Sequence, residues 1–301
     1  MSEGNMFTIK SALEWATSYL GKRKIDSPRL TAELLLIYVL GKSRLDLYLE
    51  FNRPVDADVF ALFKKLILSR SSGVPLSYLT GEQEFMGLKF KVTSDVYIPR
   101  PETEILVEET LKEIQCLKLT SSRPFVILDL GTGCGNIAIT LVKKIKNSKA
   151  YATDVSRRAL KVAMENARVH SVENKVTFLE GDLFSPLNGL NLEGRVDLII
   201  SNPPYVAASD MDKLPAEVKN EPRIALEGGE DGLSFYRRII YKAPKFLRKG
   251  GILSMEIGYN QAEAVKEIII NEGELEIPRI IKDYAGKQRV ILTKRSNRSE
   301  V

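Results

Sequence analysis

A short polar run ends one of the apolar segments of this chain, in the stretch VDLIISNPPYV that covers residues 196–206. Proline fixes its own φ and disfavours a helical conformation in the residue before it, so Pro203 and Pro204 hold the backbone extended. The two prolines also remove two N–H donors, while Asn202 adds a side-chain oxygen and Tyr205 adds an aromatic face. Rigid acceptors beside a flat ring suit a planar amino group, whose hydrogens can bond the Asn202 oxygen and the Pro203 carbonyl. The alternative is that the run only ends a strand.

A glycine-rich turn follows a second apolar segment, in FVILDLGTGCGNIAITLVKK. Gly131, Gly133 and Gly135 let the backbone turn sharply and let a ligand approach where no Cβ stands. The helix predicted behind them offers free N–H groups at its start. The spacing is G-x-G-x-G, with Asn136 where the dinucleotide fingerprint G-x-G-x-x-G has its third glycine. This loop resembles motif I of S-adenosylmethionine (SAM)-dependent methyltransferases, and a tight structural turn is the alternative.

Two acidic residues follow the next two predicted strands. Asp154, in YATDVS, can accept hydrogen bonds from both hydroxyls of a ribose, or it can cap the following helix, a task that Ser156 can perform instead. In LEGDLF, similarity to SAM enzymes places the adenine, so Asp182 would receive its amino group while Leu183 and Phe184 pack near its ring.

These residues require a sheet that brings the ends of several strands together. From about Tyr97 onward, short apolar segments alternate with helical stretches: FVILDL, KAYATD, KVTFLEG, VDLIIS and GGILSMEIG. This alternation predicts βαβ units and a parallel sheet covered on both faces. Such sheets bind ligands at the carboxyl ends of their strands, where the glycine turn and NPPY both lie.

The first 80 residues predict helices instead. Apolar residues recur at helical spacing over Thr8–Leu20 and Ala57–Ser69, and a third helix is bounded by Ser27 as N-cap, Pro28 in the first turn and Gly41 as C-cap. Alternating apolar residues around a glycine in EQEFMGLKFKVTSDV predict a β-hairpin that connects the two parts.

Composition indicates an ordinary soluble protein of a reducing compartment. The 301 residues are 44% hydrophobic and 28% charged, with a net charge of +5 that suits an anionic partner without requiring one. Cys116 and Cys134 form no C-x-x-C pair and one histidine is present, which argues against a Cys/His zinc site, so no metal is expected. The N-terminus lacks the layout of a signal peptide, and the apolar run Leu34–Leu40 is too short to span a bilayer. We therefore expect a cytoplasmic protein without a membrane partner.

The ordered motifs together resemble one family closely. LDLGTGCGNIAI, TDVS, DLIISNPPYV and EPRIALEGGEDGLSFYRRII, with GVPLSYLTGEQEFMGLKFKV and YIPRPETEILVE before them, have the order and spacing of the protein-glutamine methyltransferases of bacterial release factors, often called PrmC or HemK. The resemblance covers nearly the whole chain. It implies an α/β fold: a Rossmann-like class I SAM-dependent methyltransferase domain over 97–301 with a seven-stranded, mostly parallel sheet. A helical substrate-docking domain over 1–80 would be joined to it by the hairpin over 81–96.

The resemblance also implies a reaction and its residues. The family transfers a methyl group from SAM to the glutamine of the Gly-Gly-Gln motif in class 1 release factors, which would be the protein substrate, leaving S-adenosylhomocysteine. The cofactor site would comprise Gly131, Thr132, Gly133, Cys134, Gly135, Asp154, Asp182, Leu183 and Asn202. The glutamine amide would be held by Asn202, Pro203, Pro204 and Tyr205, of which Asn202, Pro203 and Tyr205 would be catalytic.

Some positions stay open within this resemblance. Leu183 falls where some members have a tryptophan beside the adenine, and Cys134 fills a variable position of the loop that we interpret as incidental to catalysis. In IPRPETE, Arg100, Glu102 and Glu104 could shape a substrate channel or pair with one another. Glu221, in the loop after NPPY, could belong to a lid or docking edge.

Three other functions share part of these features. Some DNA adenine methyltransferases also use NPPY, because adenine presents a planar amino group, but they flip the base and need a DNA-reading region. Here the residues after Tyr205 complete the sheet, and residues 1–80 show no arginine cluster. A non-catalytic SAM-fold protein would be expected to lose the glycines or NPPY, and methylation of another protein glutamine would use the same residues. We expect a monomer that acts on release factors without direct nucleic-acid binding.

Overall fold

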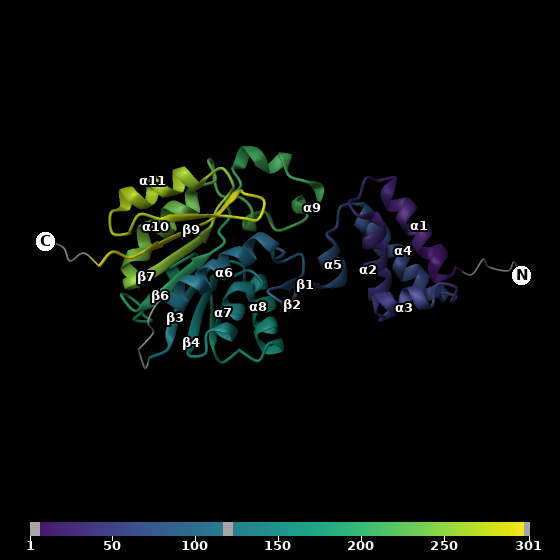
Figure 1. The fold of residues 1–301 in the computed structure, drawn as a ribbon, viewed down its shortest axis with the longest axis horizontal. Helices are drawn as coiled ribbons and strands as arrows, with labels where there is room; N and C mark the ends of the chain where they lie inside the picture. The colour runs from purple at the N-terminus through teal and green to yellow at the C-terminus, as the bar shows by residue number, and fades with distance from the viewer. Residues whose placement is uncertain (1–6, 117–122, 298–301) are drawn as a thin grey trace, which may run out of the picture. The chain divides into compact units, whose positions relative to one another are not determined.

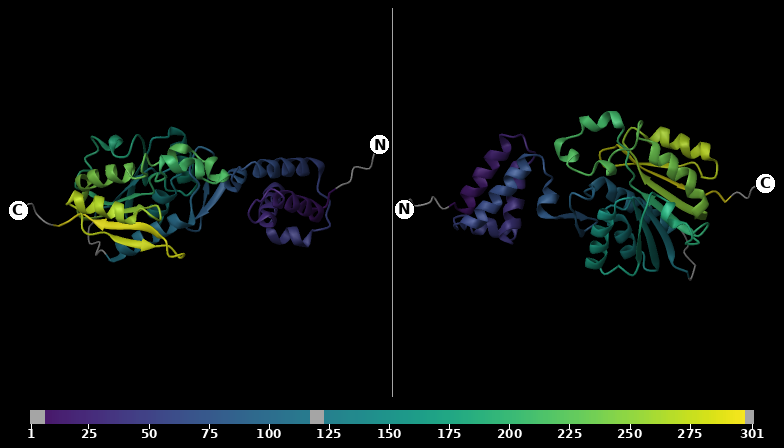
Figure 2. Two further views of the ribbon diagram at one scale, coloured as in Figure 1. Left: turned by 90° about the horizontal axis from the view of Figure 1, so that it is seen from above. Right: turned by 180° about the vertical axis from the view of Figure 1, so that it is seen from behind.

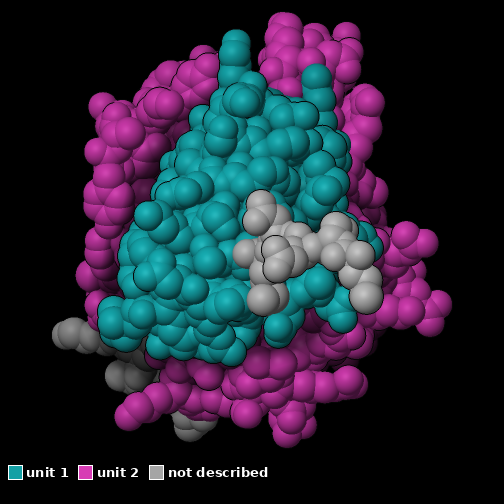
Figure 3. Space-filling model, turned by 90° about the vertical axis from the view of Figure 1, so that its right-hand side faces the viewer, with its two compact units in different colours: residues 1–82, 215–220 teal, residues 83–214, 221–301 magenta. Residues whose placement is uncertain are grey.

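The structure is a computed structural model that describes residues 7–116 and 123–297. Residues 1–6, part of the N-terminal segment judged not to be a signal peptide, lie outside the described residues. Contacts divide the chain into two compact units, coloured separately in Figure 3. Unit 1 comprises Met1–Glu82 and Pro215–Asn220, and unit 2 comprises Gln83–Leu214 and Glu221–Val301. The functional roles assigned to the ranges 1–80, 81–96 and 97–301 stay predictions.

Unit 1 is helical in its described residues, and its elements are α1 Ile9–Gly21, α2 Pro28–Leu40, α3 Arg44–Leu49, α4 Ala57–Ser71, α5 Leu76–Thr80 and α9 Ala216–Lys219. The helix-spaced apolar residues of α1, α2 and α4 meet in one core, in which Leu13, Leu35 and Phe63 are fully buried. Gly41 ends α2 with φ +63°, as predicted. Ser27 precedes α2 but makes no side-chain capping bond and has φ +47°, so its predicted capping role is wrong.

A segment distant in sequence completes unit 1. Glu217, on α9, forms an ion pair with Arg70 of α4, whose side chain is buried. The Asn220 side-chain amide donates to the Gly73 carbonyl at 3.1 Å. The short stretch Pro215–Asn220 therefore packs with the N-terminal helices, although it follows the NPPY strand in the sequence.

The predicted hairpin forms, with strands β1 Glu82–Phe85 and β2 Leu88–Lys91. Its turn residues Met86 and Gly87 both have positive φ, +54° and +75°, as tight two-residue hairpin turns require. The hairpin is attached to the main body of unit 2 by Asn166, whose side chain accepts from the Lys91 N–H at 2.7 Å and donates to the Lys91 carbonyl at 3.0 Å.

Unit 2 is built on a seven-stranded sheet in its described residues, with the order β5-β4-β3-β6-β7-β9-β8 (Figure 1). The strands are β3 Phe125–Leu130, β4 Ser148–Asp154, β5 Val176–Glu180, β6 Val196–Ser201, β7 Leu247–Glu256, β8 Arg279–Lys282 and β9 Gln288–Lys294. Neighbours from β5 to β7 run parallel, whereas β9 is antiparallel to β7 and β8. Figure 2 shows β8 and β9, in yellow, at one edge of this sheet. The predicted α/β fold, with a mostly parallel sheet and N-terminal helices, is confirmed.

Helices cover both faces of the sheet, which is why every residue of its central strands β3 and β6 is buried (Figure 1). One face packs on α10 Ser234–Phe246 and α11 Ala262–Glu272, in a core that includes Leu130, Ile199 and Met255. Unit 2 also contains the helices α6 Pro101–Cys116, α7 Asn136–Lys144 and α8 Arg157–Val169. Its short 3₁₀ helices are η1 Ser185–Leu187, η2 Ala208–Lys213 and η3 Arg223–Ala225. The described part of the chain holds no helix of the length and apolarity that crossing a membrane requires.

Candidate active site

The predicted site residues follow strand ends that are in register. Leu130, the last residue of β3, is paired with Thr153 of β4 on one side and with Ser201 of β6 on the other. Ser201 is in turn paired with Met255 of β7, and its hydroxyl donates to the Leu130 carbonyl at 2.7 Å. The glycine loop, Asp154 and NPPY therefore begin at one level along the carboxyl edge of the sheet, as expected for a ligand site in such a fold.

The glycine loop divides into an open part and a packed part. Gly131 and Gly133 have φ +74° and +56°, and a Cβ at either position would meet nothing within 4 Å. Gly135 has φ +83°, and a Cβ there would lie 3.0 Å from Ile139 and 3.1 Å from Ala163, so this glycine lets α7 and α8 approach. At the first two glycines the backbone is therefore open, with no side chain over it. A nucleoside could lie directly against the backbone there.

Asp129 braces this loop, and the sequence reasoning missed it. Its Oδ2 accepts from the Thr132 hydroxyl at 2.6 Å and from the Ala138 N–H at 3.1 Å, while its buried Oδ1 has no partner. Burial raises the pKa of Asp129 to about 7, against these two hydrogen bonds. Its place in the sequence, as an acidic residue next to last in an otherwise apolar strand, could have indicated this role. Thr132, a predicted ligand-binding residue, directs its side chain inward to this carboxyl group.

The raised pKa of Asp129 predicts a pH-dependent stability difference. The unfolded chain loses the Asp129 proton near pH 3.8, whereas the folded chain keeps it up to about pH 7. The contribution of Asp129 to the free energy of unfolding therefore falls as pH rises from 3.8 to about 7. Asp129→Asn removes this loss, and its free energy of unfolding should rise relative to wild type across that window, by at most about 4 kcal/mol. Denaturant unfolding at about pH 5 and about pH 8 measures it. If the variant and wild type differed in free energy of unfolding by the same amount at both pH values, the raised pKa of Asp129 would be contradicted. Asp210→Asn, at an exposed position, is the control.

Asp154 is not the cap of the helix that follows it. Ser156 caps α8 by accepting from the Ala159 N–H at 3.1 Å, as the sequence allowed. The Asp154 carboxylate accepts from the Gly133 N–H at 2.9 Å and from the Ser156 N–H at 2.8 Å. Burial raises the pKa of Asp154, and these two N–H groups act against the rise. The carboxylate thus connects the second strand end to the glycine loop, and its remaining lone pairs are available for hydroxyl donors.

The two residues predicted to bind adenine after β5, Asp182 and Leu183, differ in their exposure to solvent. Leu183 is buried with φ +48°, a conformation that a leucine rarely adopts, and Phe184 is buried beside it. Asp182 lies at the surface and forms an ion pair with Arg238 of α10. Leu183 can therefore serve as an apolar wall, whereas Asp182 would have to share its oxygens between Arg238 and a ligand. Both adenine roles stay predictions.

Cys134 turns its side chain into the protein interior. Its side chain is buried, and burial raises the pKa of the thiol to about 12, so the thiolate is absent at neutral pH. The thiol lies 3.6 Å from the Asn136 side-chain oxygen, and the Cys134 carbonyl accepts from Asn166 at 2.9 Å. The interpretation of this side chain as incidental to catalysis stays a prediction.

NPPY is held in place by a second glycine-rich segment, which sequence reasoning treated only as part of the resemblance. The Gln261 side chain donates to the Tyr205 carbonyl at 3.0 Å. A Cβ on Gly228 would lie 2.8 Å from both the Pro204 carbonyl oxygen and the Tyr205 Cα, so only glycine allows this approach. Burial raises the pKa of Tyr205, and its phenol remains protonated. The motif is therefore a fixed structure, as its prolines predict.

The segment before α6 contacts the loop after NPPY. Arg100 forms an ion pair with Glu221, whose carboxylate also accepts from the Ile98 N–H at 3.0 Å. Glu221 is buried, so it anchors its loop rather than forming a free lid. Glu104 accepts from the Met86 N–H in the hairpin. Of the three residues predicted either to shape a channel or to pair with one another, Arg100 and Glu104 thus have other partners, and the role of Glu102 stays a prediction.

Thr103, in the first turn of α6, lies between NPPY and the end of β7. Its hydroxyl accepts from Asn202 Nδ2 at 3.0 Å and donates to Glu256 Oε2 at 2.6 Å. Thr103 and Glu256 are both buried, and burial raises the pKa of Glu256 to about 7, while hydrogen bonds from Thr103 and Asn202 act against this rise. The sequence reasoning named neither residue.

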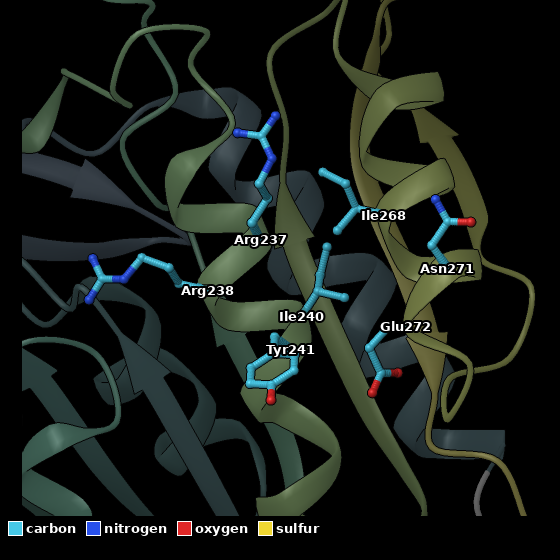
Figure 4. A pocket seen from close by; sticks show the side chains of 7 residues that line it. All are labelled: Arg237, Arg238, Ile240, Tyr241, Ile268, Asn271 and Glu272. Atoms are coloured by element: carbon cyan, nitrogen blue, oxygen red, sulfur yellow. The ribbon is translucent and has the colours of Figure 1, made fainter.

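A separate groove of about 520 Å³ lies between α10 and α11 (Figure 4). None of the predicted site residues lines it; its walls are Arg237, Arg238, Ile240, Tyr241, Ile268, Asn271 and Glu272. Arg237 and Arg238 are ion-paired with Asp231 and Asp182. Within residues 7–116 and 123–297, no three His, Cys, Asp or Glu residues gather where they could hold a metal ion.

Two family models match the chain. A model described as the PrmC N-terminal domain matches residues 11–81, and one described as the methyltransferase small domain matches residues 109–230. The first covers most of α1 and all of α2 to α5 in unit 1, and the second spans the glycine loop, Asp154 and NPPY.

Curated relatives match over most of the chain. A release factor glutamine methyltransferase from Moorella thermoacetica is 41% identical over 96% of this chain and 99% of its own length. Another protein of that name, from Geobacter sulfurreducens, is 40% identical over 86% of this chain and 87% of its own. A methyltransferase structure from Pyrococcus furiosus matches with a TM-score of 0.50 and 19% identity, over 77% of this chain and 96% of that one. This last similarity concerns the fold.

Proposed function

Because the chain belongs to the release factor glutamine methyltransferase family, we propose that it methylates the glutamine of the Gly-Gly-Gln motif in class 1 peptide chain release factors. The methyl group of SAM goes to the side-chain amide nitrogen, and the modification modulates translation termination. The observation that supports this proposal most is the register of Leu130 with Ser201, because it brings the glycine loop and NPPY to the same level of the sheet edge.

The cradle residues suit the methyl donor. Gly131 and Gly133 offer open backbone, Asp154 offers acceptors for the ribose hydroxyls, and Leu183 offers an apolar wall for the adenine. Backbone groups of Thr132, Cys134 and Gly135 complete the loop, with Asp182 at its margin. Bound SAM supplies an electrophilic methyl group on a sulfonium centre, and the product is S-adenosylhomocysteine.

The clamp residues suit the glutamine amide. The Asn202 side-chain oxygen and the Pro203 carbonyl accept its two hydrogens, while Pro204 stiffens the chain and Tyr205 provides a face for the planar group. An amide nitrogen is a poor nucleophile because its lone pair is delocalised. Holding both hydrogens favours a more pyramidal nitrogen and stabilises the positive charge that develops on it. After the methyl group has transferred, one of the two nitrogen protons leaves to solvent. Orientation of the two reactants is the chief contribution of these residues.

The test of this function compares two classes of amino group. The purified chain is incubated with methyl-labelled SAM and either an intact class 1 release factor or duplex DNA. We expect label on the protein. Label on the DNA alone would contradict the proposal, since NPPY also suits adenine, and label on neither would contradict transferase activity towards both.

Replacing Asp154 by alanine should weaken SAM binding. The variant loses the proposed ribose acceptors and also frees the Gly133 N–H, which Asp154 now holds at 2.9 Å. Hydrogen bonds to charged groups are worth about 1.5–3 kcal/mol each, so we expect the Kd to rise at least tenfold. Isothermal titration calorimetry measures it. Ser156→Ala is the control, because it removes the α8 cap but leaves the carboxylate; equal affinities for Asp154→Ala and wild type would refute the assignment.

For partners, we propose that unit 1 docks the body of the release factor while its glutamine enters at NPPY. The matched PrmC N-terminal domain lies in this unit, over residues 11–81, and the unit holds none of the proposed transfer residues. We expect a cytoplasmic monomer without direct nucleic-acid or membrane partners, which accords with the free Cys116 and Cys134.

A further inference from the structure

The clamp has a requirement that NPPY alone does not meet. A side-chain amide has an acceptor end and a donor end of nearly the same shape. If Asn202 presented its NH₂ to the substrate nitrogen, donor would face donor and the clamp would fail. Some group must therefore fix which end of the Asn202 amide faces the substrate.

A buried chain of hydrogen bonds reaches the other end of this amide. Asn202 Nδ2 donates to the Thr103 hydroxyl at 3.0 Å, and that hydroxyl donates to Glu256 Oε2 at 2.6 Å. The three residues come from separate elements: Thr103 from the first turn of α6, Asn202 from the end of β6 and Glu256 from the end of β7. Ser201 pairs with Met255, so the next residue of each strand end is a member of this chain.

The ionised carboxylate gives the chain a direction. A carboxylate only accepts, so the one hydroxyl proton of Thr103 must point at Glu256. The Thr103 oxygen then offers lone pairs alone, and only the Nδ2 end of Asn202 can face it. The Asn202 oxygen is left turned away from Thr103. A protonated Glu256 could instead donate to Thr103, which would free the threonine proton for the Asn202 oxygen and allow the amide to flip.

We propose that Glu256 and Thr103 are positioning residues, which hold the Asn202 amide with its oxygen towards the substrate nitrogen. This inference rests on the proposed function, because it assumes that Asn202 accepts from the glutamine amide. Neither residue touches the reacting atoms, since both are buried: Thr103 is 2% exposed and Glu256 is 1% exposed. They act through Asn202.

The titration of Glu256 supplies a pH signature. Burial raises its pKa to about 7, so the directing carboxylate is lost as pH falls through that value and methyl transfer should fall with it. The other charged or titratable groups around it are Tyr97, Glu102 on α6, Tyr205, Tyr236 on α10 and Arg289 on β9. Burial raises the pKa of all three tyrosines, which therefore stay neutral in this range, and Arg289 stays charged.

The test pairs two substitutions at Thr103. Thr103→Val keeps the shape and removes the hydroxyl, whereas Thr103→Ser keeps the hydroxyl. We expect kcat for methylation of an intact release factor to fall about 10²-fold in Thr103→Val and to stay near wild type in Thr103→Ser, because small misplacements of reacting groups have effects of this size. SAM affinity should be unchanged in both. Equal kcat values for the two variants would overturn the proposal.

Glu256→Gln and a measurement without substrate complete the experiment. In wild type, kcat should rise with pH to a plateau, with its midpoint near pH 7. In Glu256→Gln, kcat should be lower than the wild-type plateau and should no longer rise with pH in this range. Glu256 also accepts directly from Asn202, so the Asn202 side-chain NH₂ signals, observed by NMR in ¹⁵N-labelled protein, should follow the same titration in wild type and not in Glu256→Gln. A wild-type enzyme that leaves the release factor unmethylated contradicts the proposed function alone, and the NMR titration then decides the relay: Asn202 signals that ignore pH would overturn it.

Discussion

Replacing Asn202 by alanine is expected to lower kcat for release factor methylation by about 10²–10³-fold, the usual effect of removing one preorganised group at the reacting centre. The variant loses the side-chain acceptor for the glutamine amide, while Pro203 and Pro204 still hold the backbone extended. The β6 strand end should stay in place, because Ser201 remains bonded to the Leu130 carbonyl. A single-turnover assay with saturating SAM measures the rate of transfer directly.

The control for this variant is Asn271→Ala, which removes the same side chain from an exposed position in the groove between α10 and α11. Both variants should bind SAM with nearly the affinity of wild type. If Asn202→Ala turned over at the wild-type rate, the amide clamp would be the wrong account of NPPY.

Deleting residues 1–80 should lower kcat/KM for an intact release factor by about 10²–10⁴-fold, because a second contact raises the effective concentration of the reacting segment by such factors. The reason lies in the separation of roles between the units. The described helices of unit 1 have their own core, around Leu13, Leu35 and Phe63, while the proposed transfer residues all belong to unit 2.

A short peptide that contains Gly-Gly-Gln is the matched substrate for the deletion. It cannot span to a docking surface, so its kcat/KM should be the same with and without residues 1–80. Retained SAM affinity shows that unit 2 is folded after the loss of the helices that pack against Pro215–Asn220. Undiminished methylation of the intact release factor by a folded deletion variant would end the docking proposal.

The fold was predictable from the sequence because its signals are local. Apolar runs of the β3 and β6 type, separated by helical stretches, indicate a covered parallel sheet, and glycines after a strand mark its carboxyl end. Both expectations agree with the sheet order and with the positive φ values of Gly131 and Gly133. The helix ends were less certain: Gly41 ends α2 as expected, but Ser27 has positive φ and does not cap it.

The rest depends on contacts between residues far apart in the chain, which no local pattern encodes. Thr103 and Glu256 are separated by 153 positions, and nothing near either one marks the hydrogen bond between them. The assignment of Pro215–Asn220 to the N-terminal helices is of the same kind, through the Arg70–Glu217 pair. For Asp182, which is predicted to accept from the adenine amino group, no local pattern indicated the ion pair with Arg238 of α10.

The most direct test of the account is to map the methyl group by mass spectrometry. A class 1 release factor is incubated with the chain and SAM, digested, and its peptides are fragmented. We predict one added methyl group, on the side-chain nitrogen of the glutamine in Gly-Gly-Gln, and none when Asn202→Ala replaces the wild-type chain. A release factor methylated at any other residue, or an unmodified one alongside methylated adenine in a DNA control, would contradict it.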